Sequence, residues 1–294
     1  MLRRRALLPF AVVGLLAIGC RWAASGVSPS SQVLADTAVA RLHGHNDYLQ
    51  PVPLRTALAL GLGSVEADVY LEDGELRVGH ERWQLRPGRT LGAMYLEPLR
   101  SFAAAHGGRV RTDGAPFVLL VDIKADAEPV YRRLREELAA HSAMLTRFAA
   151  KGVEPGAVTV ILSGVRPRAL VEAEPSRWCA LDGRLADLEA VPPPSATLMP
   201  WISDAWQRVS DGNGADGLLP AETARIRELV ARAHAQGREL RFWGAPDRES
   251  MWLELWQLGV DRIGSDRPKV AAACLRAAAA EGISSSASRA TSPP

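Results

Sequence analysis

Short apolar runs of strand length alternate along the chain with longer segments that are apolar on one side only. The runs are rich in Val, Leu and Ile, and this alternation is typical of a parallel sheet covered by helices. The predicted strands are Ala38–His43, Ser64–Tyr70, Phe117–Ile123, Ala157–Ser163, Arg177–Leu181, Thr197–Trp201, Glu239–Trp243 and Val260–Gly264.

Segments with helical periodicity fill the gaps between these strands. They are Pro53–Leu62, Leu91–His106, Ala127–Ala150, Arg166–Ala173, Ala205–Val209, Ala221–Gln236, Arg248–Leu258 and Lys269–Ala280. Because each strand is followed by a helix, the pattern predicts an α/β fold, a single (β/α)8 TIM barrel over residues 37–282. A doubly wound open sheet is the alternative, but no glycine-rich dinucleotide fingerprint follows the first strand.

The first twenty residues have the pattern of a secretory signal. Three arginines precede an apolar run, Ala6–Ile18, and Cys20 follows, as in a bacterial lipoprotein signal in which the cysteine is acylated. We therefore expect residues 1–20 to be a signal peptide or lipoprotein signal. The protein would then be exported, as a periplasmic, membrane-anchored lipoprotein or a secreted protein, with membrane contact through a lipidated Cys20.

The two ends of the chain are small and polar in composition. Residues 21–36 read as a linker and residues 283–294 as a disordered tail. Neither segment has enough apolar residues to join a core.

Composition narrows the classes of partner. The chain has 35 Lys and Arg against 33 Asp and Glu, and its arginines are scattered, so no nucleic-acid partner is expected. Three cysteines are too few for a disulfide scaffold. Cys179 and Cys274 lie in apolar stretches, where we expect them to stay unpaired.

Polar residues gather where the predicted strands end, which is where a barrel places its chemistry. Glu66 and Asp68 are two residues apart on one strand, so both carboxylates point to the same face. Asp122 is at the same end of the next strand. Three inward carboxylates favour a hard divalent cation, Mg²⁺ or Ca²⁺, although a structural pairing with arginine or with Lys124 is the alternative.

Histidines gather at the same predicted rim. His43 and His45 end the first strand, and the turn at Asp73-Gly74 can return the chain so that His80 faces them. Imidazoles beside a metal can act as base and acid near neutral pH.

These motifs together resemble the altered inheritance of mitochondria protein 6 family. The blocks that carry the resemblance are 43–48 (HGHNDY), 64–69 (SVEADV), 78–80 (VGH), 89–91 (RTL), 95–99 (YLEPL), 120–124 (LVDIK), 241–243 (RFW) and 259–263 (GVDRI), with Asp266 and Pro268. The family belongs to the phosphatidylinositol-phospholipase-C-like superfamily of phosphodiesterases, which also holds glycerophosphodiester phosphodiesterases.

The resemblance implies a barrel that cleaves a phosphodiester. It implies that His43 and His80 are the catalytic histidines and that Lys124 contacts phosphate. It also implies Glu66, Asp68 and Asp122 as the metal ligands. The substrate would be a small-molecule or lipid phosphodiester.

The sequence departs from the family pattern in two respects, and it offers two further candidate residues for substrate binding. The His-Arg-Gly and Pro-Glu-Asn-Thr pattern of glycerophosphodiesterases is absent, and His45 could take the role of His43. Asn46 and Trp243 are candidate substrate contacts. The sequence does not indicate an oligomeric state.

Two other functions compete with the phosphodiesterase. A non-catalytic, exported lipoprotein that binds a phosphorylated ligand could keep the same fold. A metal-dependent amidohydrolase also begins with His-x-His, but it needs histidines after the fifth and sixth strands, and this chain has none there.

Overall fold

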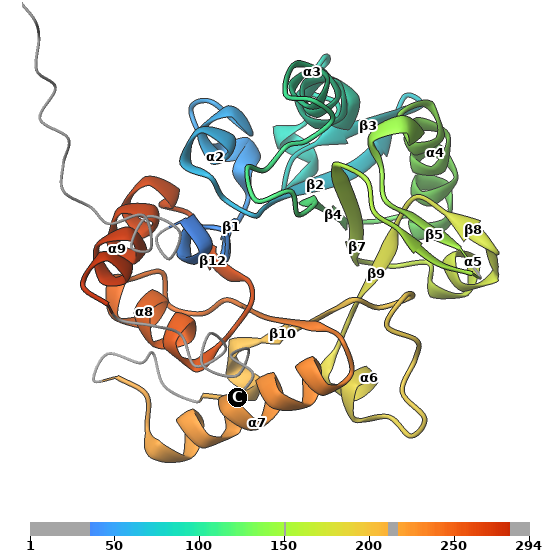
Figure 1. Ribbon diagram of the computed structural model, residues 1–294. Helices are drawn as coiled ribbons and strands as arrows, with labels where there is room; N and C mark the ends of the chain where they lie inside the picture. Colours follow the sequence, from blue (N-terminus) through green and yellow to red (C-terminus); the bar gives the residue numbers. More distant parts are fainter. Residues whose placement is uncertain (1–35, 150, 211–216, 283–294) are drawn as a thin grey trace, which may run out of the picture.

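The computed structural model describes residues 36–149, 151–210 and 217–282, and its centre is a barrel of eight parallel strands (Figure 1). The strands are β1 (Leu42–Gly44), β2 (Ser64–Glu72), β4 (Phe117–Ile123), β7 (Val158–Gly164), β9 (Ala180–Gly183), β10 (Trp201–Ala205), β11 (Glu239–Trp243) and β12 (Ile263–Ser265). Neighbouring strands pair in the order β11-β10-β9-β7-β4-β2-β1-β12. The predicted TIM barrel is confirmed. The predicted signal, most of the linker and the tail lie outside the described residues.

The ring is nearly closed. Its two end strands, β11 and β12, meet through one isolated bridge between Arg241 and Arg262 in the described chain. Every other junction is a ladder of two or more residue pairs.

Helices surround the strands on the outside (Figure 1). They are α2 (Arg55–Leu60), α3 (Glu97–Ala105), α4 (Ala127–Ala140), α5 (Arg168–Ala173), α6 (Leu185–Glu189), α7 (Pro220–Ala235), α8 (Glu249–Leu258) and α9 (Pro268–Ala280). A π-helix, Gly92–Leu96, leads into α3. Short 3-10 turns lie at Asp47–Leu49, Arg82–Gln84, Ser142–Met144 and Trp206–Arg208. No helix in the described ranges is long and apolar enough to cross a membrane.

The alternation along β4 shows how the sequence builds both sides of the barrel wall. Every second residue, Phe117 through Ile123, packs in the large core beneath the helices. Val118 and Leu120 instead join a small apolar cluster inside the barrel, with Ile161, Ala180, Trp201 and Phe148. Asp122 is the next residue on the inward face, at the C-terminal end.

The predicted excursion after β2 is an antiparallel hairpin. Strand β3 (Glu75–Val78) turns back at Asp73 and Gly74, both with positive φ, and pairs Val78 with Val69. Gly79 then donates its backbone N–H to the carbonyl of Asp68. The chain therefore returns to the barrel mouth just before His80.

A second, three-stranded sheet was not predicted. The predicted helix over 127–150 ends at Ala140, and β5 (Arg147–Ala149) follows, paired with β6 (Gly152–Glu154) and β8 (Ser176–Arg177). Strand pairing with distant segments overrides the local helical periodicity here.

Four predicted strands are displaced in the structure. The last one, predicted to begin at Val260, begins at Ile263 as β12. The first begins only at Leu42, because residues 36–39 form a helical turn. Strand β9 ends two residues later than expected, at Gly183. Strand β10 starts at Trp201 instead of Thr197, because Pro200 has no N–H for a ladder. The helix expected over 205–209 is a 3-10 turn.

Candidate active site

The deepest polar residues of the barrel mouth are His43 on β1 and Glu66 on β2. The imidazole of His43 is fully buried, with Nδ1 2.9 Å from Ser64 Oγ and Nε2 3.2 Å from Glu66 Oε2. Burial lowers the pKa of His43 to about 3, and the charge of Arg241 adds to this effect. His43 is therefore neutral.

The charge state of Glu66 fixes the tautomer of His43. Burial opposes ionisation of Glu66, but Arg241, whose Nη2 is 2.9 Å from Oε2, holds the pKa of the carboxyl well below its usual range. Since Glu66 is an ionised acceptor, His43 Nε2 donates to it and Nδ1 accepts the Ser64 hydroxyl proton. Both ring nitrogens of His43 are thus in use.

Asp68 and Asp122 form the second half of the acidic cluster. Lys124 Nζ is 2.8 Å from Asp68 Oδ2 and 3.2 Å from Asp122 Oδ1. Burial and the charge of Glu66 raise the pKa of Asp68 to about 6, although Lys124 opposes the shift. Burial also raises the pKa of Asp122.

The carboxylates of Glu66, Asp68 and Asp122 fit a cation. One oxygen of each lies within 4.8 Å of the others. Asp68 Oδ1 is buried and accepts no hydrogen bond in the described structure, and such an unpaired buried oxygen is costly. Two nearby cations, Arg241 and Lys124, leave the three carboxylates with one uncompensated charge. The donor set suits a hard divalent ion.

Tyr48 ties the loop after β1 to this cluster. Its hydroxyl lies 2.8 Å from Asp68 Oδ2 and 2.7 Å from Asn46 Oδ1, so its single proton is donated to one of the two. Asn46, with a left-handed φ of 46°, is also 3.4 Å from His45 Nδ1 through its amide nitrogen. Asn46 is thus placed between the loop tyrosine and His45.

His45 lies at the open rim, in contrast to His43. Its Nδ1 is 2.8 Å from Asp266 Oδ1, which follows β12. Burial lowers the pKa of His45, but the hydrogen bond that His45 donates to Asp266 and the charge of Glu66 outweigh it, and the net pKa is raised. His45, Trp243 and Asp266 line one small cavity of about 100 Å³. Trp243 is 44% exposed, so it is available to a substrate.

His80 is exposed on the loop after β3, directly after Gly79, whose backbone N–H bonds the carbonyl of Asp68. Its Nδ1 is 3.2 Å from Glu81 Oε1, and its backbone carbonyl accepts a bond from the Tyr70 hydroxyl. The structure thus brings the predicted residues to one end of the barrel, with His80 on its outer edge.

Two buried charged residues of the barrel, Arg241 and Asp182, were not predicted from the sequence. Arg241 forms an ion pair with Glu66. The alternation in Glu239–Trp243 could have revealed this residue, because Leu240 and Phe242 face outward and Arg241 faces inward. Asp182 is fully buried on β9 and accepts from Ser163 and Arg184. The strand predicted for this region ended at Leu181, one residue before Asp182, and so did not include this carboxylate.

Comparison with known proteins identifies the family. Residues 31–179 match the model of the AIM6-like phosphodiesterase domain. The altered inheritance of mitochondria protein 6 homolog of Arthroderma benhamiae is 30% identical over 257 residues, covering 76% of this chain and 80% of the relative. The chain belongs to the AIM6-like phosphodiesterase family. The corresponding protein of Eremothecium gossypii is also 30% identical, over 82% of this chain and 71% of its own length.

One solved structure supports the fold. A calcium-dependent phosphoinositol-specific phospholipase C from a Gram-negative Pseudomonas matches with a TM-score of 0.54 and 13% identity, over 82% of this chain and 93% of its own. A glycerophosphodiester phosphodiesterase from Agrobacterium tumefaciens matches with a TM-score of 0.45 and 13% identity, over 80% and 98% of the two chains.

The relatives overturn the predicted location. The chain was expected to be exported as a periplasmic, membrane-anchored or secreted protein, but the curated AIM6 relatives are fungal proteins named for the inheritance of mitochondria. The segment on which the export prediction rested, residues 1–20, lies outside the described residues. The charged and apolar pattern of these residues alone was too general to predict a cellular location.

Proposed function

We propose that this AIM6-like protein is a metal-dependent phosphodiesterase that cleaves a lipid-derived or glycerol phosphodiester. The observation that supports the proposal most strongly is the unpaired, buried Oδ1 of Asp68 among three carboxylates, next to the rim pair His45 and Asp266. Glu66, Asp68 and Asp122 would hold one divalent cation, Mg²⁺ or Ca²⁺. The cation would supply positive charge to the phosphate oxygens as the diester is attacked.

We assign the general base to His45 because one of its nitrogens is free. Asp266 accepts from Nδ1, which fixes the tautomer and leaves Nε2 to take a proton from the attacking oxygen. The carboxylate also stabilises the imidazolium that then forms. His43 has no free ring nitrogen, and in this proposal it positions Glu66.

His80 is the proposed general acid. Glu81 engages its Nδ1, so Nε2 is the atom that would protonate the leaving alkoxide. Lys124 offers a cation to the phosphate from between Asp68 and Asp122. Asn46 holds the loop that carries His45, and the exposed ring of Trp243 offers an apolar contact for the group attached to phosphate.

Hydrolysis assays of the full chain test the proposal. The substrates are bis-p-nitrophenyl phosphate, lysophospholipids and glycerophosphodiesters, with added Ca²⁺ or Mg²⁺ and with chelator. Chelator should abolish turnover, and His45→Gln and His80→Gln should each lower kcat by about 10²–10⁴-fold. Asp122→Asn should weaken metal binding in calorimetry.

The controls separate folding from chemistry. His106→Gln removes a histidine at the end of α3, where the ring stacks on Phe102, and should leave kcat unchanged. His43→Gln should lower kcat and metal affinity together if His43 positions Glu66. Full activity of folded His45→Gln and His80→Gln would refute the assignment, and metal-independent turnover would refute the cation. Ligand binding without any turnover would favour the phosphoryl-ligand-binding function.

A further inference from the structure

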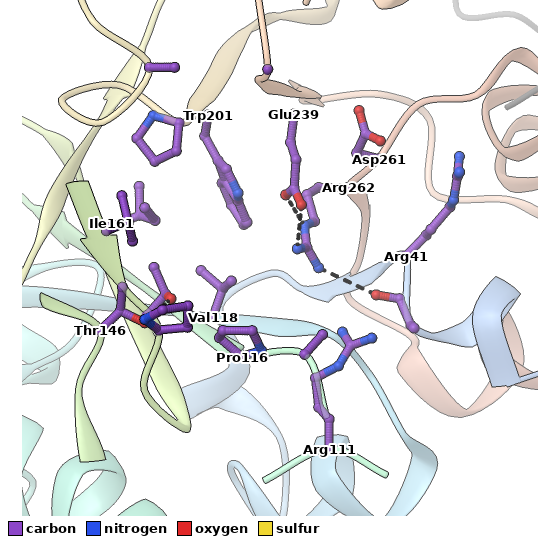
Figure 2. A pocket seen from close by; sticks show the side chains of 18 of the residues that line it. Arg41, Arg111, Pro116, Val118, Thr146, Ile161, Trp201, Glu239, Asp261 and Arg262 are labelled. Atoms are coloured by element: carbon purple, nitrogen blue, oxygen red, sulfur yellow. Dashed lines mark hydrogen bonds and ion pairs between the residues drawn. The ribbon is translucent and has the colours of Figure 1, made fainter. Parts of the chain in front are cut away.

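A cavity of about 570 Å³ opens at the N-terminal end of the barrel, away from the carboxylates. Figure 2 shows the side chains that line it. Its lining comes from the first residues of several strands, among them Val118 on β4, Trp201 on β10 and Glu239 on β11. This volume falls within the range of small-molecule sites in proteins. Nothing in the proposed phosphodiesterase reaction uses it.

The cavity has two chemically different walls. One is apolar: Val118, Ile161 and Trp201 belong to the cluster inside the barrel, and Pro116 lies beside them. The other carries Arg41, Arg111, Glu239, Asp261 and Arg262, as Figure 2 shows. A ligand that fills the space must therefore have an apolar part and a polar part.

The carboxylates on the polar wall are already engaged. Glu239 accepts two hydrogen bonds from Arg262, at 2.7 and 3.0 Å. Asp261 accepts from the backbone N–H of Leu240 and pairs with His234 at 2.9 Å. Asp113 pairs with Arg111.

Arg41 is the unmatched cation of this wall. Its Nη1 donates to the carbonyl of Val260, and within the described part of the chain no carboxylate lies at ion-pair distance from it. Burial lowers the pKa of its guanidinium, although the charge of Asp261 opposes the shift. An acceptor with negative charge would offset the effect of burial.

Two further guanidinium groups of this wall, those of Arg262 and Arg111, approach each other beside Gly63. Nη1 of Arg262 and Nη1 of Arg111 lie 2.5 and 2.6 Å from the point where a Cβ on Gly63 would stand. Only a glycine leaves room for this approach. Glu239 and Asp113 already pair with these two groups, and a further anion between them would reduce the remaining repulsion between like charges.

We propose that this cavity binds an amphiphilic anion, an alkyl or aryl chain that carries one carboxylate or phosphate group. The apolar body would lie against Val118, Ile161 and Trp201. The head group would meet Arg111, Arg262 and Arg41. A neutral hydrocarbon would fill the apolar half but leave Arg41 without a carboxylate or phosphate partner, and a cation would meet like charge.

Titration calorimetry of the full chain tests this with four twelve-carbon probes below their micelle concentrations: dodecanoate, dodecyl phosphate, dodecanol and dodecyltrimethylammonium. We expect one mole of either anion to bind per mole of protein, at least tenfold more tightly than the alcohol, and no binding of the cation. The two anions distinguish a carboxylate head from a phosphate head. Equal affinity for alcohol and anions, or no binding of either anion, would overturn the proposal.

Variants locate the binding site. Arg41→Gln combined with Arg111→Gln should weaken anion binding by about tenfold or more, because charge-assisted hydrogen bonds are lost. Ala196→Trp adds bulk at the lining without removing a contact there and should block binding. Arg100→Gln, on the exposed face of α3, is the matched control and should bind as the wild type does.

One more variant separates this cavity from the other end of the barrel. Lys124→Met removes the cation between Asp68 and Asp122 and should leave anion affinity unchanged, with folding verified by circular dichroism. If Lys124→Met abolished binding while Ala196→Trp did not, the anion would bind at the carboxylate end, and the assignment of the cavity would be wrong. This outcome is independent of whether the protein hydrolyses phosphodiesters.

Discussion

The two ends of this barrel use the same strands for opposite purposes. On the inward face of β4, Val118 and Leu120 fill the N-terminal half with apolar side chains, and Asp122, two residues further, opens the polar half. At the C-terminal end, Glu66 and Asp68 are buried carboxylates held by Arg241 and Lys124. One strand thus supplies stability at one end and chemistry at the other.

The difference shows in what burial costs at each end. Burying an apolar residue such as Ile161 stabilises the folded protein, because the side chain leaves water. A buried carboxylate such as Glu66 loses its hydration and is tolerable only while its partner remains. The polar end should therefore be more sensitive to loss of one partner than the apolar end is to loss of one side chain.

Arg241→Met gives the largest expected effect on stability. It leaves Glu66 buried beside a neutral imidazole, and the free energy of unfolding should fall by about 3–5 kcal/mol. Urea denaturation measures the change. The matched control is Arg132→Met, which breaks an exposed pair with Glu128 on α4 and should cost less than about 1 kcal/mol. Equal losses would remove the distinction between the two ends.

Ile161→Ala tests the apolar end. Removing this fully buried side chain next to the cavity should cost about 2–4 kcal/mol, since a void replaces it. Once folding is established, kcat should stay within twofold of the wild type, because the side chain lies away from the carboxylates. A large loss of kcat in the folded variant would show that the two ends are coupled.

The pKa of Asp68 predicts how metal binding depends on pH. Burial and the charge of Glu66 raise it to about 6, so below pH 6 a proton must leave before a cation can bind. Metal affinity should fall about tenfold for each pH unit below 6 and level off above it. Calorimetry in buffers of different ionisation enthalpy measures the released proton. An affinity independent of pH between 4.5 and 7.5 would contradict this.

Asp266→Asn should give the smallest effect, a shift in the pH profile of kcat/KM. Asp266 and Glu66 raise the pKa of His45 against the effect of burial, so losing the Asp266 carboxylate lowers it. In the proposed mechanism His45 is a base in its neutral form, and the acidic limb of kcat/KM should therefore move to lower pH. The maximum should also fall, since the imidazolium loses its partner. An acidic limb at an unchanged pH would mean that it belongs to another group.

Periodicity was enough to predict the barrel, because strands such as β4 and β11 carry their alternation in their own residues. The bounds predicted for both strands are those of the structure. The inward carboxylates of β2 were found by the same alternation. The small sheet of β5, β6 and β8 could not be found, since its strands are short and gain their stability from pairing with distant segments.

The arrangement of the site residues depended on contacts that sequence spacing does not reveal. His43 and His45 are two positions apart and look equivalent in the sequence. In the structure one is enclosed by Ser64 and Glu66 and the other is open to the rim beside Asp266. The difference comes from the next strand, β2, which encloses His43, and from Asp266 after β12, which lies 221 positions from His45 in the sequence. The relatives likewise corrected the expected location, which residues 1–20 alone could not decide.

The single bridge between Arg241 and Arg262 makes the barrel wall a ring with one weak joint. Backbone amides along β11 and β12 that face this joint should exchange their hydrogens with solvent faster than those in the ladders of β4. Across the joint, the ion pair from Arg241 to Glu66 acts as a brace between β11 and β2, with β12 and β1 between them. A ligand that draws Glu66 away from Arg241 would weaken this ion pair. The width of the barrel mouth should therefore depend on which ligand is bound there.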